Sequence, residues 1–174
     1  VNILIGSLLA WGTTMIDYRL IRAYTPFLWI AGVVGLTLVL IPGIGEEVNG
    51  ANAWIGLPGG FQVQPAELAK ISIIVGMSMI LSERSHDSDA PSHRDVMQAL
   101  VIAAIPVLLI LAQPDMGTVF IISCSDLTII AASGASGRWV VGLILVAVVG
   151  VYGAVQSGVV NEYQVKRLQS FVNP

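Results

Sequence analysis

Cysteine is almost absent from the sequence, because Cys124 is the single cysteine among 174 residues. One cysteine excludes an internal disulfide, and it also excludes a metal site built from several thiolates. Cys124 lies inside an apolar run, so we expect it to be buried as a small apolar residue.

Charged residues are also scarce, at 11% of the sequence against roughly 25% in ordinary soluble domains. The net charge of −3 leaves no basic stripe for nucleic acid, since such binding requires clustered Lys and Arg. Hydrophobic residues reach 55%, and the mean hydropathy is +0.82. This composition excludes an ordinary soluble protein and indicates an integral membrane protein.

Long apolar runs are abundant, and each has close to the ~20 residues that cross a bilayer as a helix. They cover approximately Val1 to Thr14, Pro26 to Pro42, Ala66 to Leu81, Val96 to Ala112, Gly117 to Gly134 and Trp139 to Gln156. We therefore predict an all-α fold, a polytopic transmembrane helix bundle of about six helices that forms a single unit over residues 1–174.

Both ends of the sequence lead us to expect a fragment of a longer protein. The first run begins at Val1, without an initiator Met and without the basic region and cleavage site of a signal peptide. The last residues, Asn173 and Pro174, follow a polar amphipathic stretch with no closing element.

The arginines between the runs predict the orientation, because cytoplasmic loops retain positive charge. Residues 43–64 and 113–116 contain no Lys or Arg, whereas the other connections contain Arg19, Arg22, Arg84, Arg94 and Arg138. We therefore predict an external loop at residues 43–65, a cytoplasmic loop at 82–97 and an external amphipathic segment at 158–174.

Glu67 and Lys70 are the first candidate site residues. They stand three positions apart at the predicted start of a helix, so they share a face and can neutralise each other. Pro65 suits the first helical position, and the helix start beside Gln64 offers a positive dipole end to an anion. The simpler alternative is an interfacial ion pair with Lys70 extended towards the headgroups.

Asp115 occupies a polar break between two apolar runs, with Pro114 before it and Gly117 after it. The simplest role is a helix N-cap, which is worth ~1 kcal/mol. If Asp115 lines the same cavity as Lys70, it could instead pair with Lys70 or bind a divalent cation, Mg²⁺ or Mn²⁺.

Three further residues are candidates for contact with a headgroup. Trp54 lies in the predicted external loop, where Trp commonly anchors at the interface. Lys166 and Arg167 lie on a weakly amphipathic segment that we expect on the external surface, available to phosphate groups of a substrate or of ordinary lipids.

Asp126 falls near the middle of its apolar run, so its charge is the most costly by position. We expect it to face protein or to be protonated. Its structural role would be a hydrogen bond to a neighbouring helix, shared with Ser123, Ser125 or Thr128, unless the helix is short and Asp126 sits at a shallow depth. A role in proton transfer is the alternative.

Five stretches of the sequence carry a resemblance to a known family. They are Asp17-Tyr18-Arg19, Asn49-Gly50-Ala51 with Trp54-Ile55, Gln64 to Lys70, Gln113 to Thr118, and Tyr163-Gln164 through Lys166-Arg167-Leu168 to Pro174. In this order they resemble the SEDS family (shape, elongation, division and sporulation) of polytopic peptidoglycan glycosyltransferases. The Gln-Pro-Asp and Tyr-Gln-x-Lys-Arg patterns are more similar to the rod-shape branch than to the division branch.

The resemblance implies an enzyme that polymerises lipid II into glycan strands at the outer face of the bacterial cytoplasmic membrane, for cell shape and elongation. It also implies partners, namely a class B penicillin-binding protein transpeptidase and other membrane proteins of the elongation or division complex. The residues expected to bind substrate are Trp54, Gln64, Glu67, Lys70, Asp115, Lys166 and Arg167.

The resemblance also sets limits. The family's proposed catalytic Asp follows the Asn-Pro that corresponds to Asn173-Pro174, so this chain resembles the second to seventh of ten helices and is expected to be inactive alone. It departs from the usual pattern at Asn52 and Ala53, where an Arg commonly precedes the Trp, and at Ala66, where Ser is usual.

Two other functions remain open from the sequence. A lipid II flippase or other transporter would also place Glu67, Lys70, Asp115 and Asp126 within a membrane bundle, although no inverted repeat is visible. A non-catalytic scaffold for cell-wall synthases would tolerate loss of Lys70.

Overall fold

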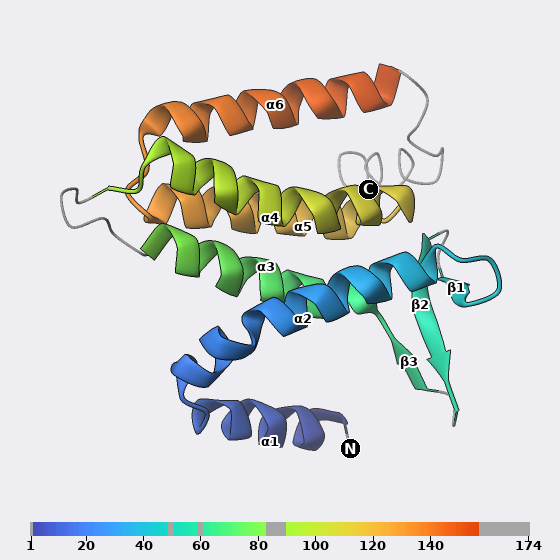
Figure 1. Cartoon of the computed structure of the whole chain (residues 1–174). Helices are drawn as coiled ribbons and strands as arrows, with labels where there is room; N and C mark the ends of the chain where they lie inside the picture. The colour runs from blue at the N-terminus through green and yellow to red at the C-terminus, as the bar shows by residue number, and fades with distance from the viewer. Residues whose placement is uncertain (1, 49–50, 59–60, 83–89, 157–174) are drawn as a thin grey trace. The chain divides into compact units, whose positions relative to one another are not determined.

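The computed structural model describes residues 2–48, 51–58, 61–82 and 90–156, and in these ranges it contains six helices and a three-stranded sheet (Figure 1). The helices are α1 (Asn2–Thr14), α2 (Tyr18–Val39), α3 (Pro65–Ser82), α4 (His93–Ala112), α5 (Met116–Ala132) and α6 (Gly137–Gln156). The strands are β1 (Gly45–Val48), β2 (Ala51–Leu57) and β3 (Phe61–Val63). Each predicted apolar run is therefore helical, which confirms the helical bundle.

Two units make up the chain, residues 1–135 and residues 136–174, so α6 is described by itself. Among the described helices, three are long and apolar enough to cross a membrane, over Arg19–Val39, Pro65–Ser82 and His93–Ala112. Met116–Ala132 and Gly137–Gly153 are shorter apolar helices. These lengths and compositions are those of a multi-pass membrane protein.

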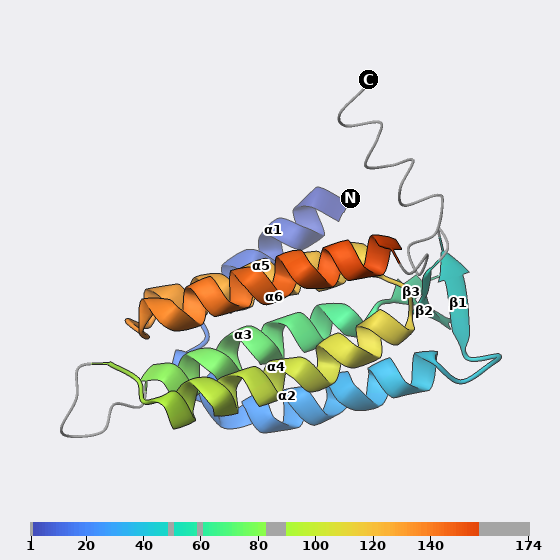
Figure 2. The same cartoon turned by 90° about the horizontal axis from the view of Figure 1, so that it is seen from above.

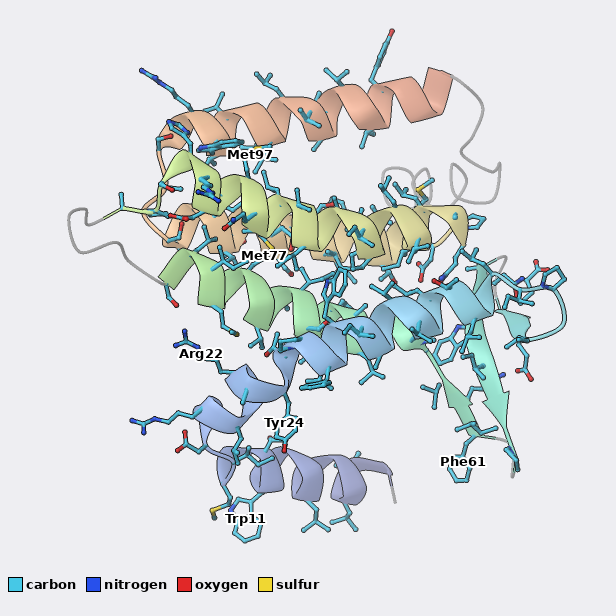
Figure 3. All side chains as sticks on the ribbon, viewed as in Figure 1. Trp11, Arg22, Tyr24, Phe61, Met77 and Met97 are labelled. Atoms are coloured by element: carbon cyan, nitrogen blue, oxygen red, sulfur yellow. The ribbon has the colours of Figure 1, made fainter. Side chains whose placement is uncertain are left out.

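Within the first unit, α3 is the central helix, since it packs against α2, α4 and α5 (Figure 2). The Met77 side chain of α3 is fully buried, and Figure 3 shows it pointing towards α4 and α5. On the opposite side, α2 approaches α3 so closely that a Cβ on Gly32 would lie 3.1 Å from the Ala69 Cα atom. Small residues at such contacts are typical of helix pairs in membranes.

Pro106, inside α4, creates a backbone group that needs a partner from another helix. Proline has no N–H, so the Ile102 carbonyl one turn earlier loses its usual donor. The Trp29 indole Nε1 of α2 donates to this oxygen over 3.1 Å. A side chain 73 residues away thus replaces the missing backbone hydrogen bond.

The end of α2 has the same requirement. The N–H of its C-cap, Leu40, bonds to Thr37 and Leu38 instead of to the Leu36 carbonyl, which would be its partner in a continuing helix. The Gln113 Nε2 donates to the Leu36 oxygen over 2.9 Å, and the Gln113 side chain is 1% exposed. The last turn of α2 and the C-cap of α4 are therefore joined directly.

Two segment boundaries differ from the prediction. Helix α2 begins eight residues before Pro26, because the Asp17 side chain caps it by accepting from the Arg19 N–H, and Pro26 is accommodated inside the helix. Helix α4 begins at His93, inside the predicted loop 82–97, because Ser92 and Asp95 form a capping box. The segment predicted at 158–174 lies outside the described residues.

The predicted loop at residues 43–65 contains the sheet, which the sequence analysis missed. The sheet is antiparallel in the order β1-β2-β3, with a register shift between Glu46 and Glu47. Its strands have seven residues or fewer and are separated by Gly, Pro and Asn, so period-2 alternation is too brief to recognise. The all-α assignment holds for the apolar runs and not for this loop.

Two expectations for α5 need correction. This helix buries Thr118, Ile122, Asp126 and Ile130 at four-residue spacing, and Cys124 lies off that stripe and is exposed, so its predicted burial is wrong. Asp126 is 8% exposed and faces protein as expected, but its Oδ1 has no hydrogen bond. The hydroxyls of Ser125 and Thr128 donate to backbone carbonyls of α5 instead.

The Trp29 to Ile102 hydrogen bond predicts a result for a double-mutant cycle. We expect Trp29→Phe to lower the free energy of unfolding by about 1 kcal/mol, because it leaves the Ile102 carbonyl without a donor. In a Pro106→Ala background the N–H at position 106 can bond to Ile102, so the same Trp29→Phe change should cost clearly less. Unfolding of the purified protein in detergent measures both steps, and an equal cost in the two backgrounds would contradict this role for Trp29.

Candidate functional site

Asp115 and Gln64 form the first half of the candidate site. The Gln64 Nε2 donates to the Asp115 Oδ2 over 3.1 Å, so the residue before α3 meets the residue before α5. Asp115 caps α5 as predicted, because its Oδ1 accepts from the Thr118 N–H over 3.1 Å. The Thr118 hydroxyl adds a third hydrogen bond, over 2.7 Å to Oδ2. Three donors hold the Asp115 carboxylate in one orientation.

Glu67 and Lys70 form the second half. The Lys70 Nζ lies 2.6 Å from the Glu67 Oε1, which confirms the predicted pairing along the first two turns of α3. The two partners differ in exposure, since the Lys70 side chain is 18% exposed and the Glu67 side chain 60%. The Lys70 ammonium group is therefore paired with a Glu67 carboxylate that faces outward, and an incoming anion could displace this carboxylate.

Local sequence explains how α3 presents these groups. Pro65 begins the helix as predicted, and the Glu67 N–H donates to the Gln64 carbonyl over 3.1 Å. Gln64 therefore stands at the N-cap position with its amide free to reach Asp115. Between the described side chains of Lys70 and Asp115 the structure records no ion pair, so the two halves of the site are joined through α3 and not by a direct contact.

Gln113 and Thr118 are site residues to which the sequence analysis gave no role. Gln113 is buried and fastens the end of α4 to α2, and Thr118 holds the Asp115 carboxylate. The signal available in the sequence was their place in the matched stretch from Gln113 to Thr118. The Gln113 Oε1 is buried without a hydrogen-bond partner.

Among the residues that it describes, the structure does not bring the other predicted substrate-binding residues into hydrogen bonds with Gln64, Lys70 or Asp115. Trp54 is half-buried in β2, where it lies opposite Glu46 of β1, and no hydrogen bond between described residues joins it to Gln64, Lys70 or Asp115. Lys166 and Arg167 lie outside the described residues. Their predicted roles in substrate binding stay predictions.

The described residues do not fit a protein cage for a divalent cation. No group of three or more His, Cys, Asp or Glu side chains converges among them. Both Asp115 oxygens already accept hydrogen bonds, and the Glu67 Oε1 is paired with Lys70. A cation at Asp115 would have to bring most of its ligands with it, as Mg²⁺ does when it binds through substrate phosphates and water.

The two halves of the site lie at the same end of the first unit. Figure 1 shows the start of α3 and the turn between α4 and α5 at the end that carries the sheet. Arg22 of α2 lies away from this end, as Figure 3 shows. Polar and charged side chains are therefore gathered at the end of the first unit where apolar helices end.

Comparisons with known proteins show the family of the chain. The family model for FtsW, RodA and SpoVE, described as cell cycle protein, matches residues 1–174. The chain is 35% identical to the "Probable peptidoglycan glycosyltransferase FtsW" of Trichlorobacter lovleyi, over 98% of this chain and 44% of that protein. It is 33% identical to stage V sporulation protein E of Bacillus subtilis, over 98% of this chain and 45% of that protein.

Two solved structures are similar. The rod shape determining protein RodA of Thermus thermophilus matches with a TM-score of 0.68 and 29% identity, over 83% of this chain and 46% of that one. A structure described as the structural coordination of polymerization and crosslinking by a peptidoglycan synthase complex matches with a TM-score of 0.74 and 26% identity, over 99% of this chain and 49% of that one. The chain spans less than half the length of these relatives.

The geometry of Asp115 predicts a difference between two substitutions. Asp115→Ala removes the cap of α5 and the partner of Gln64, so we expect it to lower the free energy of unfolding by about 1 to 2 kcal/mol. Asp115→Asn should cost less than Asp115→Ala, because the Asn oxygen can still accept from the Thr118 N–H and cap the helix, although its NH2 group replaces the oxygen that accepts from Gln64. Thermal or denaturant unfolding in detergent compares the two, and equal losses would contradict the capping geometry.

Proposed function

The chain belongs to the FtsW, RodA and SpoVE family of cell cycle proteins, and on this basis we propose that the protein containing it is a peptidoglycan glycosyltransferase that polymerises lipid II. Lipid II carries a disaccharide on a polyprenyl pyrophosphate, so its recognition needs positive charge, acceptors for sugar hydroxyls and an apolar surface for the tail. The observation that supports this proposal most directly is the joining of Gln64 to Asp115, beside the Lys70 and Glu67 pair, at one end of an apolar bundle.

Lys70 has the chemistry to bind the pyrophosphate. Its side chain is mostly buried, and so its charge interacts with a partner more strongly than that of a fully solvated lysine would. The partner that it holds, Glu67, is exposed and can turn into solvent when phosphate oxygens replace it. Lys70 would then stabilise negative charge on the departing pyrophosphate, which is where charge develops during glycosyl transfer.

Asp115 has a different role in this proposal. A carboxylate that is already held by three donors is a fixed acceptor, suited to orient sugar hydroxyls. We do not assign it the proton transfer from the acceptor sugar, since the family resemblance assigns that step to an Asp beyond Pro174. Trp54, Lys166 and Arg167 are proposed as further contacts to the headgroup of the substrate.

The location, partners and cation follow as parts of the same proposal. The active face would be the external face of the bacterial cytoplasmic membrane, because the connections at the other end carry the arginines. A class B penicillin-binding protein transpeptidase would crosslink the product, since the similar peptidoglycan synthase complex coordinates polymerization with crosslinking, and other elongation or division proteins would lie nearby. The rod-shape patterns favour elongation, and Mg²⁺ or Mn²⁺ would arrive with the pyrophosphate.

The test is polymerisation of purified lipid II by the complete protein, beside Lys70→Ala and the matched control Ser78→Ala. Ser78 lies on the same helix and donates only to the Ile74 carbonyl, so its loss should leave the polymer unchanged. We expect long glycan strands from the parent and the control, and a decrease of at least about tenfold for Lys70→Ala, equivalent to 1.4 kcal/mol of transition-state stabilisation. Assays with EDTA, Mg²⁺ and Mn²⁺ measure the dependence on cation.

Other outcomes would identify the alternatives. Normal polymer from Lys70→Ala would refute the site. No polymer from the parent, together with lipid II movement across vesicles, would identify a flippase. Neither activity, together with normal assembly of the synthase complex, would identify a scaffold.

A further inference from the structure

The register of the sheet defines an apolar face and a polar face, and Trp54, opposite Glu46, lies on the polar face. Leu57 pairs with Phe61 and Ile55 with Val63, and residues that pair directly across strands lie on the same face. These four side chains form what we call the hairpin face. On the other face, Glu46 accepts a hydrogen bond of 2.7 Å from the Gln62 Nε2, across the position of Gly56.

The hairpin face is covered at one end and bare at the other. Ala53 belongs to the same side of β2 by alternation and is 1% exposed, where β2 packs on α2 and α3. Further along, Leu57 is 46% exposed, Val63 41% and Phe61 72%. The sheet therefore extends beyond the helices that cover its base, and its exposed part carries no charged side chain on this face.

The direction of the strands shows what the bare part faces. Figure 1 shows β2 and β3 running across the axes of α2 and α3, so in a membrane they lie along its surface. Only Gln64 separates β3 from α3, which places the hairpin at the level where α3 enters the bilayer. In Figure 3 the Phe61 ring projects from the far end of the hairpin, away from the helices that cover its base.

We propose that the hairpin face is a membrane-docking surface, in which Leu57, Phe61 and Val63 insert into the headgroup and upper acyl region of the bilayer beside α2 and α3. The exposed apolar side chains of α3, Leu68 and Ile71, begin within two turns of Val63, so the docking surface is continuous with exposed apolar surface of a helix that is long enough to cross the membrane. Amphipathic elements at this boundary bury their apolar face about 5 to 10 Å deep. The polar face, with Glu46 and Gln62, would then point to water.

This docking would fix the hairpin above the lipid next to the candidate site. Gln64, which follows β3 directly, is the residue that holds Asp115. An anchored hairpin would therefore restrain the position of Gln64 as well. The proposal stands on the sheet alone and does not depend on glycan polymerisation.

Neighbouring residues of β3 provide the test, because Phe61 and Gln62 are adjacent in sequence and lie on opposite faces. In the complete protein, with Cys124→Ser and any other cysteine removed, Phe61→Cys and Gln62→Cys are each labelled with the environment-sensitive fluorophore nitrobenzoxadiazole and reconstituted into phosphatidylglycerol and phosphatidylethanolamine vesicles. We expect blue-shifted emission from position 61, quenched by lipids with a nitroxide near the headgroup. Position 62 should emit as in water and be quenched by iodide. Leu57→Cys, opposite Phe61, should behave as position 61 does.

Two results would overturn the proposal. Equal quenching of positions 61 and 62 by iodide would show that both faces are in water. Blue-shifted emission at position 61 that neither iodide nor nitroxide lipid quenches would show that protein, such as a partner chain paired along β3, covers the face instead of lipid.

Discussion

The requirement that every backbone polar group find a partner away from water shapes this bundle more than any other constraint. In an apolar environment an unpaired carbonyl is destabilising, because no water is present to replace a lost donor. Two carbonyls lose their helical partners, at Ile102 because of Pro106 and at Leu36 because α2 ends. Trp29 and Gln113 supply the missing donors, and both hydrogen bonds connect α2 to α4. The proline inside α4 and the end of α2 therefore each produce a specific hydrogen bond between the two helices.

The candidate site follows from the second of these contacts. Gln113 fastens the end of α4 to α2, and two residues later Asp115 starts α5 and receives Gln64 from the start of α3. Four helices meet at this end through one short stretch of sequence. In this stretch Gln113 is structural, because its amide is buried against backbone, while Asp115 is partly exposed and can meet a ligand. The Lys70 and Glu67 pair adds charge on the same helix that Gln64 precedes.

Local features of the helices were predictable from the sequence, whereas the short strands of the sheet and the contacts between distant segments were not. The helices, the Glu67 and Lys70 pair and the Asp115 cap depend on residues within four positions, which periodicity and capping rules describe. The Gln64 to Asp115 hydrogen bond joins residues 51 positions apart, and nothing in either local pattern specifies the other. Cys124 was wrongly expected to be buried because a run that is apolar on all sides does not show which face meets lipid.

The central claim is that the end of the bundle with Gln64, Lys70 and Asp115 meets the headgroup of lipid II. The most direct measurement is photo-crosslinking in membranes, with a photoreactive amino acid at the exposed position of Glu67 and a control at Ser92, which caps the far end of α4. The proposal predicts a lipid II adduct at position 67 that unlabelled lipid II suppresses, and none at position 92. Adducts of equal yield at both positions, or none at position 67, would contradict it.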